Sequence, residues 1–222
     1  MATTETLERL TPEKTETTEA RPPSRRRRGR TYVAAGGIAV GGLLLTLSAV
    51  MQGNADFSKD YVARQLAEQR ITFKAAEALT PAERETPCLV KFAGQALTTG
   101  PQAECYANHF IGVHLKSVAD GKTFSEMRGV QTDVRNRVTE AQAKGDPAAG
   151  DLQRQLNEIT GKRQALFEGE SMRGLLLTSY GFDTLGRKAG EAATVARGAG
   201  IGVLVLSGLA LIWVATTRRS TV

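Results

Sequence analysis

Histidine is scarce in this chain of 222 residues, which contains only two. A non-haem iron oxygenase typically needs two histidines and a carboxylate on one face of the metal, and zinc hydrolases draw on the same ligand types. His109 and His114 are five residues apart, so on one α-helix their side chains would point about 140° from each other. The sequence therefore argues against metal catalysis, and we expect no metal ion and no cofactor.

Catalytic motifs are also lacking. No glycine-rich phosphate loop follows an apolar strand, and the nucleophile motif G-x-S-x-G does not occur. The two cysteines are too far apart for a C-x-x-C redox motif. We therefore expect a protein that is not an enzyme.

A basic face for nucleic acid is missing as well, although the net charge is +6. Much of that charge lies in arginines that flank two apolar segments: Arg25, Arg26, Arg27, Arg28, Arg30, Arg218 and Arg219. A nucleic-acid site would need Lys and Arg gathered on one folded surface. We expect no nucleic-acid partner and interpret the arginines as topology determinants that contact anionic membrane lipid.

Charge is absent from the two long apolar runs, residues 31–51 and 198–216. Each is long enough to cross a hydrocarbon core of about 30 Å as a helix, which takes roughly 20 residues. Basic residues near the ends of a span stay on the cytoplasmic side. The sequence predicts a two-pass cell-membrane protein with both termini cytoplasmic and residues 52–197 extracytoplasmic.

The first apolar run has an alternative interpretation as a cleaved signal peptide. It is longer than the roughly 7–15 apolar residues of a signal sequence, and no good A-x-A cleavage site follows it. This favours an uncleaved anchor. Residues 1–30, rich in Thr, Glu and Pro, are expected to form a disordered cytoplasmic tail, and residues 217–222 a short cytoplasmic tail.

Helix signals dominate the segment between the spans. Thr80, Gly100 and Thr123 each begin a capping or proline-led pattern, and the first span is expected to continue as helix to about Gln69. We expect residues 88–100 to be irregular and residues 124–166 to form an antiparallel helical hairpin, either projecting or lying along the domain. An apolar helix follows, which Gly181 and Gly186 are expected to interrupt. The predicted fold is mainly α, with two transmembrane helices flanking an extracytoplasmic helical domain.

The helix expected from Gly100 to about Ala119 has one broad apolar side. At 100° per residue, His114 falls on that side between Phe110 and Val118, and His109 falls on the polar side. A histidine on an apolar face is ordinarily a core residue. The alternative is a pH-sensitive contact at His114, because the unperturbed pKa of histidine is near 6.5.

The two cysteines, Cys88 and Cys105, both lie in the expected outer domain. An even count outside the membrane favours a disulfide over two free thiols. A bridge closing a loop of this length stabilises a fold by about 3 kcal/mol.

Small residues and one charge pair indicate contacts between helices. Gly37 with Gly41, and Gly198 with Gly202, form G-x-x-x-G patterns, which let membrane helices pack closely on each other or on another protein. Glu170 and Arg173 form an i,i+3 pair. That pair is either a simple surface pair or a contact near the membrane surface.

Three stretches of this chain resemble a family of small two-pass membrane proteins of actinobacteria. They are Gly94–Pro101 leading to Cys105, His114–Leu115 with Asp120–Glu126, and Leu166–Phe167 with Glu170–Leu177. Some members of that family carry the automatic label of aromatic ring-opening dioxygenase. The resemblance implies the topology and the location, and it implies no activity.

Two functions remain open. The favoured hypothesis is a non-catalytic accessory or scaffold subunit of the cell envelope that binds a membrane-protein partner or self-associates. The alternative is an extracytoplasmic sensor or binder of a small apolar ligand or lipid, which requires a cavity among the outer helices.

Overall fold

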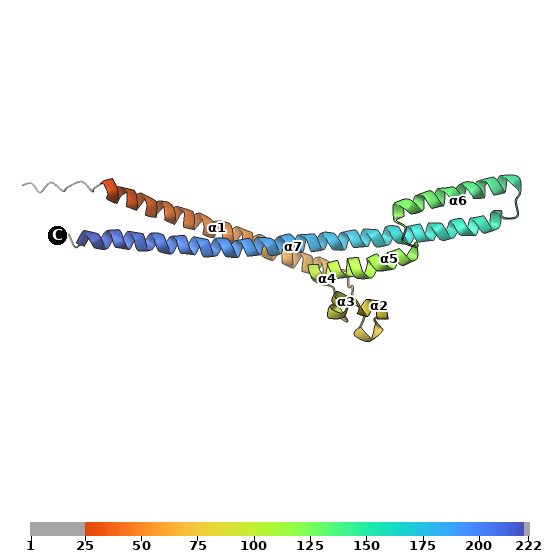
Figure 1. Ribbon diagram of the computed structural model, residues 1–222, viewed down its shortest axis with the longest axis horizontal. Coiled ribbons are helices and arrows are strands. Elements are labelled where there is room, and N and C mark those ends of the chain that lie inside the picture. Colours follow the sequence, from red (N-terminus) through yellow and green to blue (C-terminus); the bar gives the residue numbers. More distant parts are fainter. Residues whose placement is uncertain (1–24, 220–222) are drawn as a thin grey trace, which may run out of the picture. The chain divides into compact units, whose positions relative to one another are not determined.

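The computed structural model describes residues 25–219, and this part of the chain is mainly α-helical (Figure 1). The two longest helices are α1 (Arg25–Glu68) and α7 (Ala149–Arg219). Between them lie the 3₁₀ turn η1 (Ala76–Ala78), α2 (Pro81–Arg84), α3 (Pro87–Phe92), α4 (Gly100–Cys105), the π-helix η2 (Tyr106–Ile111), α5 (Gly112–Val118) and α6 (Phe124–Lys144). The predicted fold class, two long apolar helices flanking a helical middle region, is confirmed.

The start of α1 corrects one expected boundary. Residues 1–24, most of the expected disordered tail, lie outside the described part, but helix begins at Arg25 rather than Thr31. The side chains of Arg25–Arg28, Arg218 and Arg219 lie outside it too.

The apolar parts of α1 and α7 are long and apolar enough to cross a membrane. The helical segments in question are Gly29–Glu68 and Ala149–Thr217, and the most apolar 18-residue stretch of each has a mean hydropathy of 2.0 and 2.2, respectively. Only 17% and 11% of these two stretches are buried, whereas the core helix of a soluble protein would be mostly buried. Both helices can therefore serve as membrane spans.

The chain divides into two compact units, Met1–Gly42 with Gly202–Val222 and Leu43–Ile201. In the first unit, Gly37 of α1 lies against Ser207 of α7, and a Cβ at Gly37 would overlap the Ser207 hydroxyl. The Arg30 guanidinium lies over the Trp213 ring, 4.6 Å from its centroid. Gly37 thus has the close-packing role that its spacing predicts, and Gly41 is buried.

In the second unit, α1 and α7 meet along small side chains. The Ser48 hydroxyl donates to the Ala193 carbonyl at 2.7 Å, and the Ser58 hydroxyl donates to the Phe182 carbonyl at 2.8 Å. A Cβ at Gly186 would lie 2.8 Å from the Ser58 Cβ. The two backbones can therefore approach closely here without any bulky side chain between them.

This contact corrects one prediction. Gly181 and Gly186 do not interrupt α7, which is continuous, because Gly186 is used for the approach of α1 rather than for a break. A Cβ at Gly198 or Gly202 would meet nothing within 4 Å, so packing of this pair on another protein stays a prediction.

The middle of the second unit has a compact core built around aromatic rings. Phe73 contacts Phe92 and Tyr106 with ring centroids 5.6 and 5.3 Å apart, and Tyr106 contacts Phe110 at 4.7 Å. Burial raises the pKa of the Tyr106 phenol. An isolated bridge, Thr72 with Ala96, joins the chain on either side of α2 and α3.

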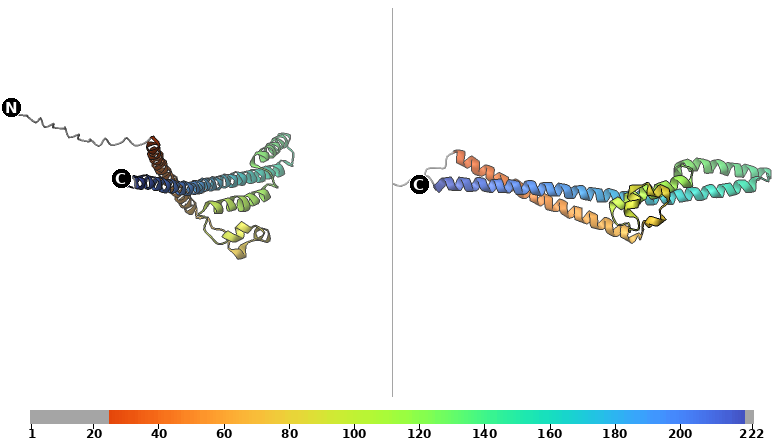
Figure 2. Two further views of the ribbon diagram at one scale, coloured as in Figure 1. Left: turned by 60° about the vertical axis from the view of Figure 1, so that its left-hand side comes forward. Right: turned by 60° about the horizontal axis from the view of Figure 1, so that its bottom comes forward.

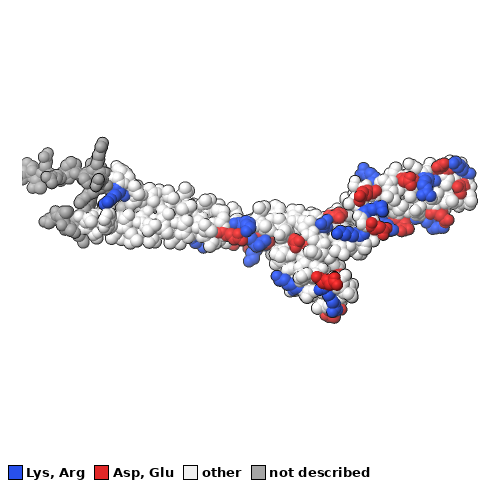
Figure 3. Space-filling view, viewed as in Figure 1, with Lys and Arg blue, Asp and Glu red and all other residues white. Residues whose placement is uncertain are grey.

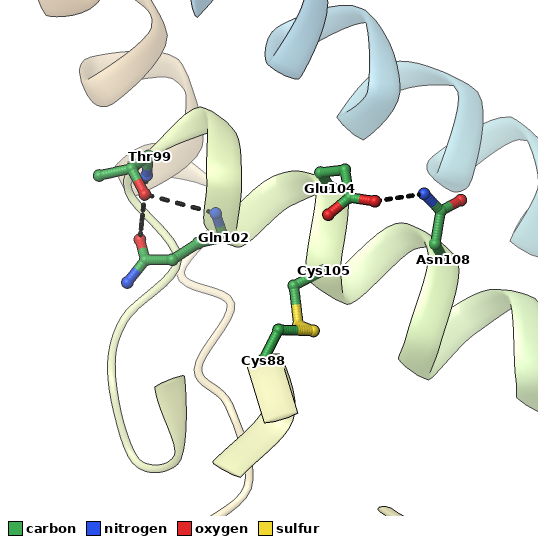
Figure 4. Close-up of a disulfide and its surroundings, with 6 residues drawn as sticks. All are labelled: Cys88, Thr99, Gln102, Glu104, Cys105 and Asn108. Carbon is green, nitrogen blue, oxygen red and sulfur yellow. Dashed lines mark hydrogen bonds between the residues drawn. A yellow bond between two sulfur atoms is a disulfide. The ribbon is translucent and has the colours of Figure 1, made fainter. Parts of the chain in front are cut away.

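Cys88 and Cys105 form the predicted disulfide, with their Cα atoms 6.0 Å apart (Figure 4). The bond ties α3 to the end of α4. The prediction that residues 88–100 are irregular is wrong at its start, because Pro87 begins the short helix α3.

The helical segment from Gly100 to Val118 begins as predicted but contains a π-helix. Thr99 and Gln102 form a capping box (Figure 4). The Gln102 side-chain oxygen also accepts from the Thr98 amide at 2.9 Å, and Gln102 is buried. A π-helix has more residues per turn than an α-helix, so an α-helical projection loses register across η2. Val113, just after η2, is 57% exposed.

Residues 124–166 form the predicted antiparallel hairpin of α6 and the start of α7. Thr123 and Glu126 form the expected capping box, and Gly145 ends α6 in the left-handed conformation with φ of 64°. The Gln131 amide donates to the Thr160 hydroxyl at 2.7 Å. Figures 1 and 2 show the hairpin tip reaching beyond α5, and Figure 3 shows acidic and basic side chains alternating over the hairpin. It is a projecting arm.

Candidate functional site

An apolar groove lies between the last turns of α1 and the middle of α7, inside the second unit. Its volume is about 560 Å³. The lining is chiefly apolar and includes Tyr61, Ile71, Phe167, Met172, Leu175 and Phe182. This size and composition are typical of ligand pockets, which measure about 300–1,000 Å³ and carry few polar groups.

The floor of the groove belongs to the hydrophobic core. Val62, Leu66 and Leu176 line it, and their exposed fractions are 3%, 2% and 3%. Side chains packed into a core hold fixed rotamers. The groove is therefore a preformed surface.

The rim of the groove is exposed. Leu175 is 71% exposed and Phe182 is 55% exposed, and both precede the apolar run that begins at Gly198. Contiguous exposed apolar surface generally marks a binding site. Gln65, Gln69 and Ser171 add a few hydrogen-bonding groups to the lining.

A smaller, polar cavity of about 180 Å³ lies on another side of α7. Its lining includes Asn108 from the π-helix, Lys116, Lys122, Glu170 and Arg173. We call it the basic pocket, because three cationic side chains and one carboxylate line it.

Arg173 is held in place at the wall of the basic pocket. Its Nη1 donates to a Glu170 oxygen at 3.2 Å, which confirms the expected i,i+3 pair, and its Nη2 donates to the Asn108 oxygen at 3.1 Å. The Asn108 amide donates in turn to Glu104 at 2.8 Å (Figure 4). Arg173 lies 25 residues before Gly198, where the second apolar run begins, or about 38 Å along the helix. A contact of this pair near the membrane surface stays a prediction.

Both histidines are exposed and line a third cavity, of about 380 Å³, together with Lys74 and Glu83. The core interpretation of His114 is therefore wrong. The π-helix is the reason, because it brings side chains five residues apart toward the same side. Within residues 25–219, no group of three His, Cys, Asp or Glu side chains is placed to hold a metal ion.

Sequence reasoning found the parts of these sites but not the sites. The sequence singled out the pair Glu170 and Arg173, and it predicted an apolar helix after the hairpin. The apolar helix that follows the hairpin lies outside the two long apolar runs. An apolar helix face outside a membrane span was the sequence signal for the groove. The G-x-x-x-G spacing of Gly186 and Gly190 was a second signal, because a Cβ at Gly190 would lie 3.5 Å from Ala55 of α1.

Comparisons with family models, with curated proteins and with solved structures found no match. The groove and the basic pocket are therefore the features that bear on function.

Proposed function

We propose that this protein is a non-catalytic integral membrane protein whose outer helical unit binds the hydrocarbon chain of a lipid in the groove between α1 and α7. The observation that carries the proposal is the apolar groove of about 560 Å³ on a surface outside the two apolar runs. An empty groove of this kind leaves apolar side chains in water, and an apolar ligand would remove them from it.

The groove has dimensions that suit one hydrocarbon chain. On α7 it runs from Phe167 to Phe182, a rise of about 22 Å at 1.5 Å per residue. One leaflet of a bilayer accommodates its chains within half of the hydrocarbon core, or about 15 Å. A chain of that length can lie along the groove from end to end.

The proposed location is the cell membrane, with both termini cytoplasmic and residues 52–197 outside. The arginines outside each apolar run support this orientation. The disulfide between Cys88 and Cys105 supports an oxidising compartment for the middle region. We also propose a relationship to the two-pass actinobacterial family, which would agree with this topology and assigns no activity.

Labelling of intact cells tests the orientation. The variant Asp146→Cys places a free thiol at the hairpin tip, next to Gly145. A maleimide that does not cross membranes should label this thiol in intact cells. Labelling that requires lysis would reverse the proposed topology.

Photo-crosslinking tests the lipid site. Membranes are loaded with a lipid that carries a photoreactive group on its chain, irradiated, and the crosslinked peptides of the protein are identified by mass spectrometry. We expect adducts on the groove segments of α1 and α7 in addition to those on the apolar runs.

Two matched variants on α7 make the test specific. Leu175→Glu places a carboxylate in the groove, whereas Leu185→Glu changes a residue of similar exposure, 69% against 71%, that does not line it. Leu175→Glu should abolish the groove adducts and Leu185→Glu should preserve them. Adducts confined to residues 31–51 and 198–216, or equal labelling of both variants, would contradict the proposal.

A second proposal is an accessory or scaffold subunit of the cell envelope, and the projecting hairpin favours it. The arm is covered with charges of both signs (Figure 3), which is typical of a polar contact surface rather than of a lipid site. Crosslinking in native membranes followed by mild-detergent purification should recover a partner, and replacement of residues 142–150 by Gly and Ser should lose it. A protein that is monomeric and without partners in that experiment would count against the scaffold.

A further inference from the structure

We propose that the basic pocket binds a small anion of the phosphate class. This site is distinct from the apolar groove. At 100° per residue, Leu175 in the groove lies about 180° around α7 from Leu166, which lines the basic pocket. Neither site needs the other to be occupied.

The charge of the pocket favours an anion. Lys116, Lys122 and Arg173 line it and are opposed by the single carboxylate of Glu170, which already accepts from Arg173. Among residues 25–219, neither Lys116 nor Lys122 belongs to an ion pair. The pKa of Glu126, which does not line the pocket, is lowered chiefly by its hydrogen bonds from Thr123, with a smaller contribution from Lys122. Two lysines are thus left with charge that an anion can neutralise.

Arg173 is preorganised for the same purpose. Glu170 and Asn108 each accept from one of its terminal nitrogens, at 3.2 and 3.1 Å. Its Nε is buried and has no hydrogen-bond partner in the described chain. A guanidinium fixed in this way loses little conformational entropy when it donates its remaining hydrogens to an oxyanion.

The π-helix supplies the residue that aims Arg173. The Asn108 side chain donates its amide to Glu104 at 2.8 Å, and this hydrogen bond leaves the Asn108 oxygen facing Arg173. Asn108 is a residue of η2, and π-helical turns occur frequently at functional sites.

The size of the pocket limits the ligand. Its volume of about 180 Å³ equals roughly six waters at about 30 Å³ each, below the range of about 300–1,000 Å³ for drug-sized ligands. A phosphate group with a few waters fits.

Equilibrium binding of radiolabelled inorganic phosphate tests the site, with the full chain held in phosphatidylcholine nanodiscs. We expect saturable binding that weakens about tenfold in Lys116→Gln and again in Lys122→Gln, as expected for the loss of one charge-assisted contact each. Lys59→Gln, on α1 and outside the pocket, should bind as the wild type does. Leu175→Glu should also bind phosphate normally, so failure of the lipid proposal would not remove this one.

A second set of nanodiscs, containing phosphatidic acid, distinguishes the source of the phosphate group. Competition by that lipid would identify a lipid head group as the ligand, and unchanged binding would identify a free phosphate; either result supports the site. The proposal is overturned if phosphate does not bind saturably, if chloride displaces it equally well, or if both lysine variants bind as tightly as the wild type.

Discussion

Gly100, the first residue of α4, lies directly against Asp183 of α7. A Cβ at Gly100 would come within 2.6 Å of both Cγ and Oδ2 of that side chain. Asp183 is buried and pairs with Arg187 at 3.1 Å. A carboxylate near a helix N-terminus also interacts favourably with the helix dipole. This contact joins the beginning of α4 to α7.

Replacement of Gly100 by alanine should therefore destabilise the second unit by about 1–3 kcal/mol, the usual cost of overpacking a tight contact. Gly174→Ala is the matched control, because a Cβ there meets nothing within 4 Å. It should stabilise α7 by about 0.5–1 kcal/mol through helix propensity. Thermal unfolding of both variants in detergent measures the difference. Equal midpoints would contradict the contact.

Loss of the disulfide should have a larger effect. The double variant Cys88→Ala/Cys105→Ala removes a bond that closes a sequence separation of 17, and about 3 kcal/mol of stability should be lost. The control is the wild type after reduction, which should unfold at a similar temperature. Insensitivity of the wild type to a reductant that reaches the bond would mean that the bridge contributes little.

Local signals in the sequence predicted local structure well. Thr80, Thr99 and Thr123 each accept a capping hydrogen bond, because a capping box involves only residues within three positions of each other. Gly94, between α3 and α4, and Gly145 both have positive φ, and Gly145 ends α6 inside the predicted hairpin. The disulfide followed from two cysteines in one expected compartment.

Features that depend on tertiary packing could not be predicted in the same way. Gly186 is a helix breaker by propensity, yet it stays helical because Ser58 of α1 packs against it. The π-helix changed the side on which His114 lies, and no residue between Tyr106 and Ile111 signals that change. The groove requires α1 and α7 to lie together, which a sequence pattern on either helix alone does not specify.

Acid should weaken the interactions of Glu83 in the second unit. The hydrogen bond from Lys74, at 2.8 Å, and then the bond from the Thr80 amide hold the pKa of Glu83 below its usual value of 4.5. Because the pKa of Glu83 is lowered in the folded state, the ionised carboxylate stabilises the fold fully at pH values above its usual pKa. This stabilisation is lost as the pH falls through the lowered pKa of the folded state.

The variant Glu83→Gln isolates this charge, since glutamine can still complete the capping box. Its unfolding temperature should be lower than that of the wild type at neutral pH, and the two should converge at low pH. Glu85→Gln, on a residue that forms no ion pair in the described chain, should keep the acid profile of the wild type. A constant difference between Glu83→Gln and wild type at all pH values would exclude the charge as the cause.

The projecting hairpin depends on a buried amide between its two helices. Gln131 is 7% exposed, donates to Thr160 at 2.7 Å and accepts from Nη1 of Arg163 at 2.9 Å. Gln131→Leu nearly keeps the side-chain size but removes the hydrogen bonds to Thr160 and Arg163, so about 1–3 kcal/mol of stability should be lost. Gln142→Leu, near the end of the same helix and exposed, is the control and should change stability by less than about 0.5 kcal/mol. Hydrogen exchange should show faster exchange in α6 of Gln131→Leu with little change in α4 and α5, because the hairpin extends beyond them; uniform acceleration would mean that the arm does not unfold separately.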